Sequence, residues 1–135
     1  MVKKLLLMMM MLWSPTYYWV VSAKKVEASI DNKLGIGKNL SVHCQSKDDD
    51  LGEHSISNDE SFKWEFSPNV WETTLYFCVL GWERVRSYEF DAYSFGRDRS
   101  RCETRCAWLV SIEGIYALND QTTLWEFFYP WPPLS

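Results

Sequence analysis

Two histidines, His43 and His54, carry the side chains best suited to acid and base catalysis in this sequence. A pair of imidazoles can serve as general base and general acid, as in secreted ribonucleases. His43 directly precedes Cys44 in an alternating segment, so its side chain is expected on the face opposite the cysteine, whereas His54 lies in an acidic segment. Because no convincing nucleophile accompanies them, we expect a protein that is not an enzyme and uses no cofactor.

Four cysteines are the other reactive groups: Cys44, Cys78, Cys102 and Cys106. An even number in a short chain of the secretory pathway is typical of a disulfide framework, and a bridged sulfur cannot act as a nucleophile. A four-thiolate zinc site is the alternative, but Cys102 and Cys106 lack a matching second pair. Two disulfides are therefore expected, with three connectivities open. We favour Cys44 with Cys106 and Cys78 with Cys102, because a bridge from Cys102 to Cys106 would close little chain.

The secretory context comes from residues 1–23. Two lysines precede an apolar run at Leu5–Trp13, and Val21–Ala23 offers small residues spaced for signal peptidase. A membrane anchor would need ~20 uninterrupted apolar residues, and Ser14–Thr16 breaks this run early. We expect residues 1–23 to be a signal peptide and residues 24–135 to be one secreted domain with no membrane span.

Short segments with alternating apolar and polar residues recur along residues 24–135, and no apolar stripe persists at helical spacing. This pattern predicts an all-β fold, an antiparallel β-sandwich of seven to eight strands held by two disulfides. The run at Thr73–Leu80 is apolar on both faces, as expected of a central strand. The other expected strands are Val26–Ile30, Leu40–Cys44, Phe62–Phe66, Ser87–Tyr93, Cys106–Ser111, Gly114–Leu118 and Leu124–Tyr129.

Charge is distributed unevenly over the chain. Residues 24–135 contain 12 basic and 18 acidic residues, a formal net charge of −6, which argues against a nucleic-acid partner. Lys47–Ser61 is expected to form an acidic loop with a formal charge of −5, and Ser94–Arg105 a basic loop with four arginines. Exposed loops of this kind are candidates for binding a charged partner. The candidate partner-binding residues are Lys47, Asp48, Asp49, Asp50, Arg97, Asp98, Arg99 and Arg101.

Three further features could bind ligands or carry modifications. The run Asp48–Asp50 supplies hard oxygen ligands for calcium, but contiguous acids do not match the alternate spacing of an EF-hand, which leaves only a weaker extracellular site as an alternative. Asn39 begins an N-x-S sequon and is a candidate glycosylation site. Tryptophans can stack on sugars; we expect Trp64 and Trp108 to be buried and Trp82 and Trp131 to be exposed.

The stretch Gly37–Gly52, GKNLSVHCQSKDDDLG, resembles the signature of the plant self-incompatibility protein family, the S-protein homologues. One departure is Glu72, which stands where the family usually has glycine. The resemblance continues through Trp71–Cys78, Trp82, Phe90–Tyr93, Cys102, Cys106, Trp108, Gly114–Tyr116 and Tyr129–Trp131.

This resemblance implies a secreted, disulfide-stabilised β-sandwich with no enzymatic activity. In poppy such proteins are ligands secreted by the stigma and recognised by a pollen membrane protein, and recognition there is associated with hydrophilic loops. The expected function is therefore a secreted signalling ligand that binds a membrane receptor on another cell. The alternative is a module that binds acidic cell-wall polysaccharide through exposed aromatic rings and arginines.

Overall fold

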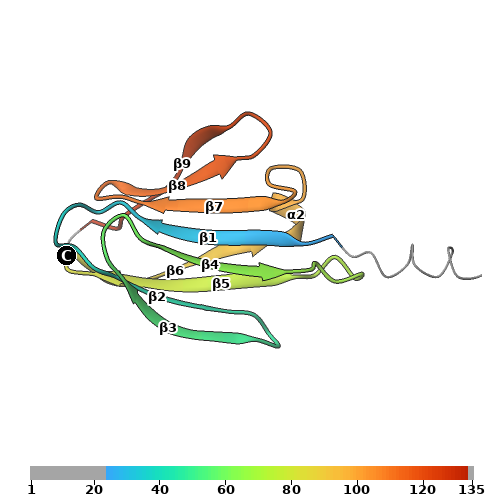
Figure 1. The fold of residues 1–135 in the computed structure, drawn as a ribbon, viewed down its shortest axis with the longest axis horizontal. Helices are drawn as coiled ribbons and strands as arrows, with labels where there is room; N and C mark the ends of the chain where they lie inside the picture. The colour runs from blue at the N-terminus through green and yellow to red at the C-terminus, as the bar shows by residue number, and fades with distance from the viewer. Residues whose placement is uncertain (1–23, 134–135) are drawn as a thin grey trace, which may run out of the picture.

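The computed structural model describes residues 24–133 and shows two packed β-sheets (Figure 1). The expected signal peptide, residues 1–23, lies outside the described residues. The five-stranded sheet has the order β4-β1-β7-β8-β9, and the four-stranded sheet has the order β3-β2-β5-β6. The strands are β1 (Val26–Asn32), β2 (Leu40–Gln45), β3 (Asp50–Ile56), β4 (Ser61–Phe66), β5 (Leu75–Trp82), β6 (Val85–Ser94), β7 (Arg105–Val110), β8 (Gly114–Asn119) and β9 (Leu124–Pro130).

The predicted all-β sandwich is confirmed, and most neighbouring strands are antiparallel. One pair differs from the prediction, because β1 and β7 run parallel, with Glu27 beside Arg105 and Asn32 beside Val110. The helix α2 (Phe95–Asp98) has four residues and joins the two sheets between β6 and β7. Within residues 24–133, no helix has the length and apolar character needed to cross a membrane.

Alternating burial explains why the predicted strands form. In β2, Leu40, Val42 and Cys44 are buried and the residues between them are not, so one face packs on the opposite sheet and the other meets solvent. Strand β5 is central, between β2 and β6, as predicted. Trp108 in β7 is fully buried and, with its neighbours in both sheets, fills the space between the layers.

Strand β3 was not among the predicted strands. The segment Lys47–Ser61 was expected to be one acidic loop, but Asp50–Ile56 pairs with β2 as an edge strand. Only Ile56 of this strand is buried, so the apolar alternation that identifies a half-buried strand is missing from its sequence. The predicted loop is therefore reduced to two turns, residues 46–49 and residues 57–60, on either side of β3. In the first turn the Ser46 amide donates to the Asp49 carbonyl at 2.7 Å.

The two disulfides join Cys44 to Cys78 and Cys102 to Cys106. The expected pairing of Cys44 with Cys106 and of Cys78 with Cys102 is therefore wrong. Cys44 and Cys78 lie directly opposite each other on β2 and β5, and Cys102 and Cys106 close a short loop that leads into β7. All four sulfur-bearing side chains are buried, so the bridges reinforce the interior of the fold.

Turns and loops gather at the two ends of the sandwich. We call one of them the α2 end: it contains the turn 46–49, the loop 67–74, α2 with the following residues 99–104, and the turn 120–123 (Figure 1). The register places these segments together, because Gln45 lies opposite Phe77 and Leu75 lies opposite Ser94. The opposite end carries the loop 33–39 and the C-terminal residues 131–133.

Removal of the two disulfides should have unequal effects on stability. The Cys44–Cys78 bridge spans 34 residues and the Cys102–Cys106 bridge spans 4. Because loop-closure entropy grows with loop length, the double variant Cys44→Ala/Cys78→Ala should lose about 4 kcal/mol and Cys102→Ala/Cys106→Ala about 2 kcal/mol. Urea denaturation of the two variants and the oxidised parent measures this difference. Equal losses, or a larger loss for the short loop, would contradict the entropic account.

Candidate recognition surface

The two histidines do not form a catalytic pair. In the β2–β3 register His43 faces Glu53, and His54 faces Val42. Since Val42 belongs to the buried face of β2, the two imidazoles lie on opposite faces of the sheet. His43 Nε2 instead lies 2.6 Å from Asp50 Oδ1, and the His54 ring stacks on Phe62. These arrangements hold the β2–β3 hairpin and the adjoining strand β4 in place.

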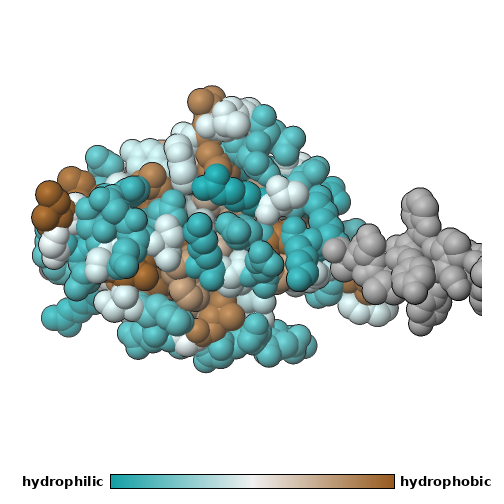
Figure 2. All heavy atoms as spheres, in the orientation of Figure 1, coloured by the Kyte–Doolittle hydropathy of each residue, from teal (hydrophilic) through white to brown (hydrophobic). Residues whose placement is uncertain are grey.

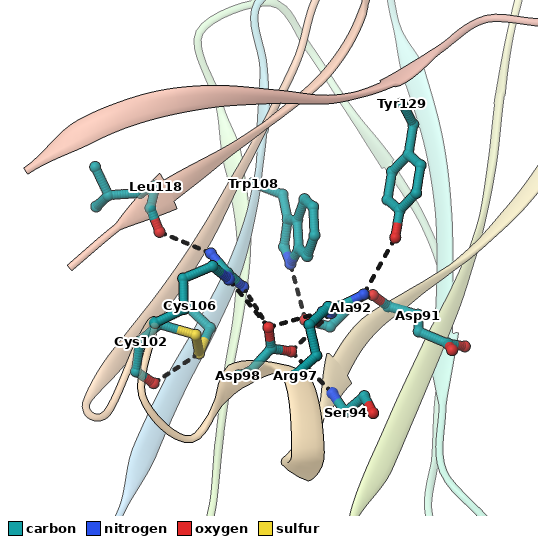
Figure 3. A network of polar contacts seen from close by, with 11 residues as sticks. Asp91, Ala92, Ser94, Arg97, Asp98, Cys102, Cys106, Trp108, Leu118 and Tyr129 are labelled. Atoms are coloured by element: carbon teal, nitrogen blue, oxygen red, sulfur yellow. Dashed lines mark hydrogen bonds and ion pairs between the residues drawn. A yellow bond between two sulfur atoms is a disulfide. The ribbon is translucent and has the colours of Figure 1, made fainter. Parts of the chain in front are cut away.

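The basic segment is organised around one buried carboxylate, that of Asp98 (Figure 3). Asp98 is 0% exposed. It accepts a hydrogen bond from the Ser94 amide at 2.9 Å. Arg97 donates to it through two nitrogens, at 2.8 and 2.7 Å, and Arg101 does the same at 3.0 and 2.8 Å. One carboxylate thus accepts hydrogen bonds from two guanidinium groups and from the backbone amide at the start of α2.

Both guanidinium groups are also fixed by the core. Each lies over the Trp108 ring, with the Arg97 carbon at 5.2 Å and the Arg101 carbon at 5.1 Å from its centroid. Arg97 donates to the Tyr129 hydroxyl, and Arg101 donates to the Leu118 carbonyl at 2.7 Å. Burial by itself lowers the pKa of Arg97, but the hydrogen bonds and charge of Asp98 outweigh burial and raise it.

The expected exposure of the basic loop is wrong for part of the predicted partner-binding set. Asp98 and Arg101 are buried and form an ion pair with each other. Arg97 is half-buried and pairs with the same carboxylate. The charges in the sequence indicated an exposed basic loop, because charged residues are usually exposed. The sequence did not show that Arg97 and Arg101 form ion pairs with Asp98. Of the arginines proposed at this end, Arg99 remains exposed.

The acidic residues of the turn are exposed, as expected. Lys47, Asp48 and Asp49 project from the turn 46–49, and Asp50 begins β3. The backbone amide of Gly52 donates to Asp50 at 2.9 Å and His43 hydrogen-bonds the same carboxylate, so both lower the pKa of Asp50. Within residues 24–133 no group of three or more His, Cys, Asp or Glu side chains is arranged to hold a metal ion.

The loop 67–74 carries an exposed apolar group that sequence reasoning missed. Trp71 is 79% exposed and Val70 is still more exposed. Asn69 holds the loop by accepting from the Thr73 amide at 3.1 Å. Glu72 has a φ of +60°, a conformation that favours glycine, which agrees with the glycine that the family resemblance led us to expect here. The sequence could have indicated this loop, because apolar and polar residues do not alternate as in a strand between Pro68 and Thr73.

A groove of about 480 Å³ separates the acidic turn from this loop. Its walls carry Asp48 and Asp49 on one side and Asn69 and Thr73 on the other. Tyr76 lies in the same groove, and burial raises its pKa, with the nearby charge of Asp49 adding to the effect. The α2 end therefore combines acidic, amide and aromatic groups around one depression.

The tryptophan predictions are partly confirmed. Trp64 and Trp108 are buried, as expected. Trp82 is also buried and Trp131 is half-buried, so their predicted exposure is wrong. The C-terminal segment folds back on the sandwich: Trp131 packs on Trp82 and donates to the Ser111 carbonyl at 2.8 Å.

The glycosylation candidate Asn39 lies in the loop before β2, at the end of the sandwich opposite α2. Its side chain is exposed, and Leu40, the next residue, is buried as the first core residue of β2. A glycan at this position would therefore extend away from the core.

These features define a class of protein: a small, disulfide-bridged β-sandwich with polar loops at its ends. Residues 27–131 match the family model described as plant self-incompatibility protein S1, and the chain belongs to this family.

Individual relatives agree with this assignment. S-protein homolog 2 from Arabidopsis thaliana is 37% identical over 116 residues, which cover 83% of this chain and 71% of the relative. Self-incompatibility protein S1 from Papaver rhoeas is 28% identical over 105 residues, which cover 77% and 76% of the two chains.

A solved structure shares the fold, with a TM-score of 0.59 and 20% identity over 84% of this chain and 95% of the other. It represents self-incompatibility protein homologues, described as a widespread family of small, highly stable, secreted proteins from plants. The shared fold agrees with the family match.

Replacement of the buried carboxylate should strongly destabilise the fold. The variant Asp98→Ala leaves the buried Arg101 and the half-buried Arg97 without their counter-charge, which costs about 3–5 kcal/mol. Denaturation with the disulfides intact provides the measurement. Asp48→Ala is the matched control, since this exposed aspartate should change stability by less than about 0.5 kcal/mol. Similar small effects for both variants would show that the cluster does not stabilise the protein.

The turn should also show a defined pH response. The folded-state pKa of Asp50 is lowered from 3.8, so its contacts support the hairpin above the unfolded pKa and are lost as pH falls through the lowered value. Carboxyl carbon NMR should place its midpoint below 3.8. In His43→Ala the midpoint should rise only in part, because the Gly52 amide still donates. A midpoint at or above 3.8 in the parent would contradict these contacts.

Proposed function

We propose that this protein is a secreted, non-enzymatic signalling ligand that binds a cell-surface receptor on another cell through its α2 end. The observation that carries the proposal is the exposed Trp71 in the loop 67–74, which lies across the groove from the exposed side chains of Lys47, Asp48 and Asp49. Tryptophan is enriched among the residues that contribute most to binding at protein interfaces. Charged groups around them speed encounter and select the partner.

Family membership supports the same function. The relative from Papaver rhoeas is called a self-incompatibility protein, and self-recognition between pollen and pistil is one setting in which such a ligand would act. The proposed binding residues are Lys47, Asp48, Asp49, Asp50, Trp71 and Arg99. Asn39 is the proposed glycosylation site, and its place at the opposite end leaves the α2 end open to a receptor.

A module for acidic cell-wall polysaccharide is the second candidate. It is favoured by a smaller groove of about 310 Å³ at the opposite end, where Arg84 lies with Trp82 and Trp131. An arginine beside aromatic rings suits a sugar carboxylate and the face of its ring. This candidate predicts binding that fades with salt and depends on Arg84, whereas the receptor proposal predicts dependence on the α2 end.

Binding of the oxidised domain to plant membranes and to polygalacturonate across a salt series tests the two candidates. Trp71→Ser and Asp48→Asn/Asp49→Asn should each weaken saturable membrane binding by about tenfold or more. The matched controls, Ile112→Ser and Glu65→Asn/Glu89→Asn, change exposed groups elsewhere and should leave it intact. Unchanged membrane binding in the α2-end variants, or binding only to polygalacturonate that Arg84→Gln abolishes, would reject the receptor proposal.

A further inference from the structure

The first half of β9 extends beyond the rest of the sandwich. Four consecutive residues, Leu124–Phe127, are exposed although they belong to a strand. Leu124 is 64%, Trp125 39% and Phe127 49% exposed. The five-stranded sheet is wider than the four-stranded sheet, and only the second half of β9 reaches the core, where Phe128 and Tyr129 pack on Trp108. In Figure 2 a small group of brown, hydrophobic spheres protrudes at the top of the view, beside white and teal ones.

The four sheet edges differ in how they are protected. An edge strand has unpaired amide and carbonyl groups, and charged side chains usually prevent it from pairing with another chain. Edges β3, β4 and β6 each carry several charged side chains, whereas Glu126 is the single charged residue of β9. The charges on the other edges are Asp50 and Glu53 on β3, Lys63 and Glu65 on β4, and Arg86, Glu89 and Asp91 on β6.

We propose that β9 is a homodimer interface, in which its free edge pairs antiparallel with β9 of a second copy. The choice of occupant follows from charge and shape. Charged side chains on an edge strand discourage pairing, and among the sheet edges within residues 24–133 β9 carries the fewest of them. Self-pairing is isologous and closes at two copies, so it uses up the unprotected edge without forming a fibre.

Antiparallel geometry also accommodates the one charge on this edge. Directly opposite residues share a face of the sheet. If the two-fold axis passes at Trp125 or Phe127, aromatic side chains face each other across the new pair, and Glu126 does not lie opposite its own counterpart. Cross-strand aromatic pairs each contribute roughly 0.2–1 kcal/mol, whereas like charges directly opposite are destabilising. The five-stranded sheets of the two copies then form one continuous ten-stranded sheet across the dimer.

Sedimentation of the oxidised domain over a wide concentration range tests the dimer. The parent should pass from monomer to dimer and no further, and Trp125→Lys should raise the dissociation constant by about tenfold or more. Trp71→Lys is the matched control, since it introduces the same charge at an exposed tryptophan away from β9 and should leave the dimer intact. Leu124→Lys provides a second test at an exposed position, so that a folding defect in one variant does not decide the result.

Hydrogen exchange gives an independent readout. Free-edge amides of β9 should gain protection as the parent concentration rises, while those of the β3 edge should not. A parent that stays monomeric at all concentrations would overturn the proposal. Association that Trp125→Lys and Leu124→Lys leave unchanged, or that Trp71→Lys abolishes, would also overturn it. The receptor proposal does not depend on this result, because its variants lie outside β9.

Discussion

The buried carboxylate of Asp98 is the constraint on which the connection between the two sheets depends. Without it, Arg97 and Arg101 could not lie over Trp108, because a guanidinium group is costly to bury without a counter-charge. With it, the short helix α2 fits against the core and leads the chain from β6 into β7. The same arrangement withdraws Arg101 and much of Arg97 from solvent, whereas Arg99, Glu103 and Arg105 remain exposed.

Much of the fold could be predicted because alternation is a local property of the chain. In segments such as Leu40–Cys44 the alternation predicts which residues are buried, and the structure confirms that these residues are buried. Strand β3 could not be predicted in this way, because only one of its residues is buried and its sequence therefore lacks apolar alternation. Its formation depends on backbone pairing with β2, which is a property of the partner strand as much as of its own sequence.

The residues of the candidate site could be predicted only where the residue types themselves indicate that the side chains are exposed. Lys47, Asp48 and Asp49 in the turn 46–49 are exposed, as expected for consecutive charged residues. Arg101 is also charged, yet it is buried, since its partner Asp98 comes within reach only when α2 forms. Disulfide pairing could not be derived for a similar reason. Cysteine spacing does not contain the register that places Cys44 opposite Cys78.

The parallel pairing of β1 with β7 has a consequence for the order of folding. Strand β1 is an interior strand of its sheet, between β4 and β7, although it comes first among the described strands. Its partner Arg105 lies far along the chain from Glu27, and contacts of such high sequence separation form slowly. A nascent chain that ends before β7 leaves β1 with one open edge. The native sheet can therefore be completed only after most of the chain has been synthesised.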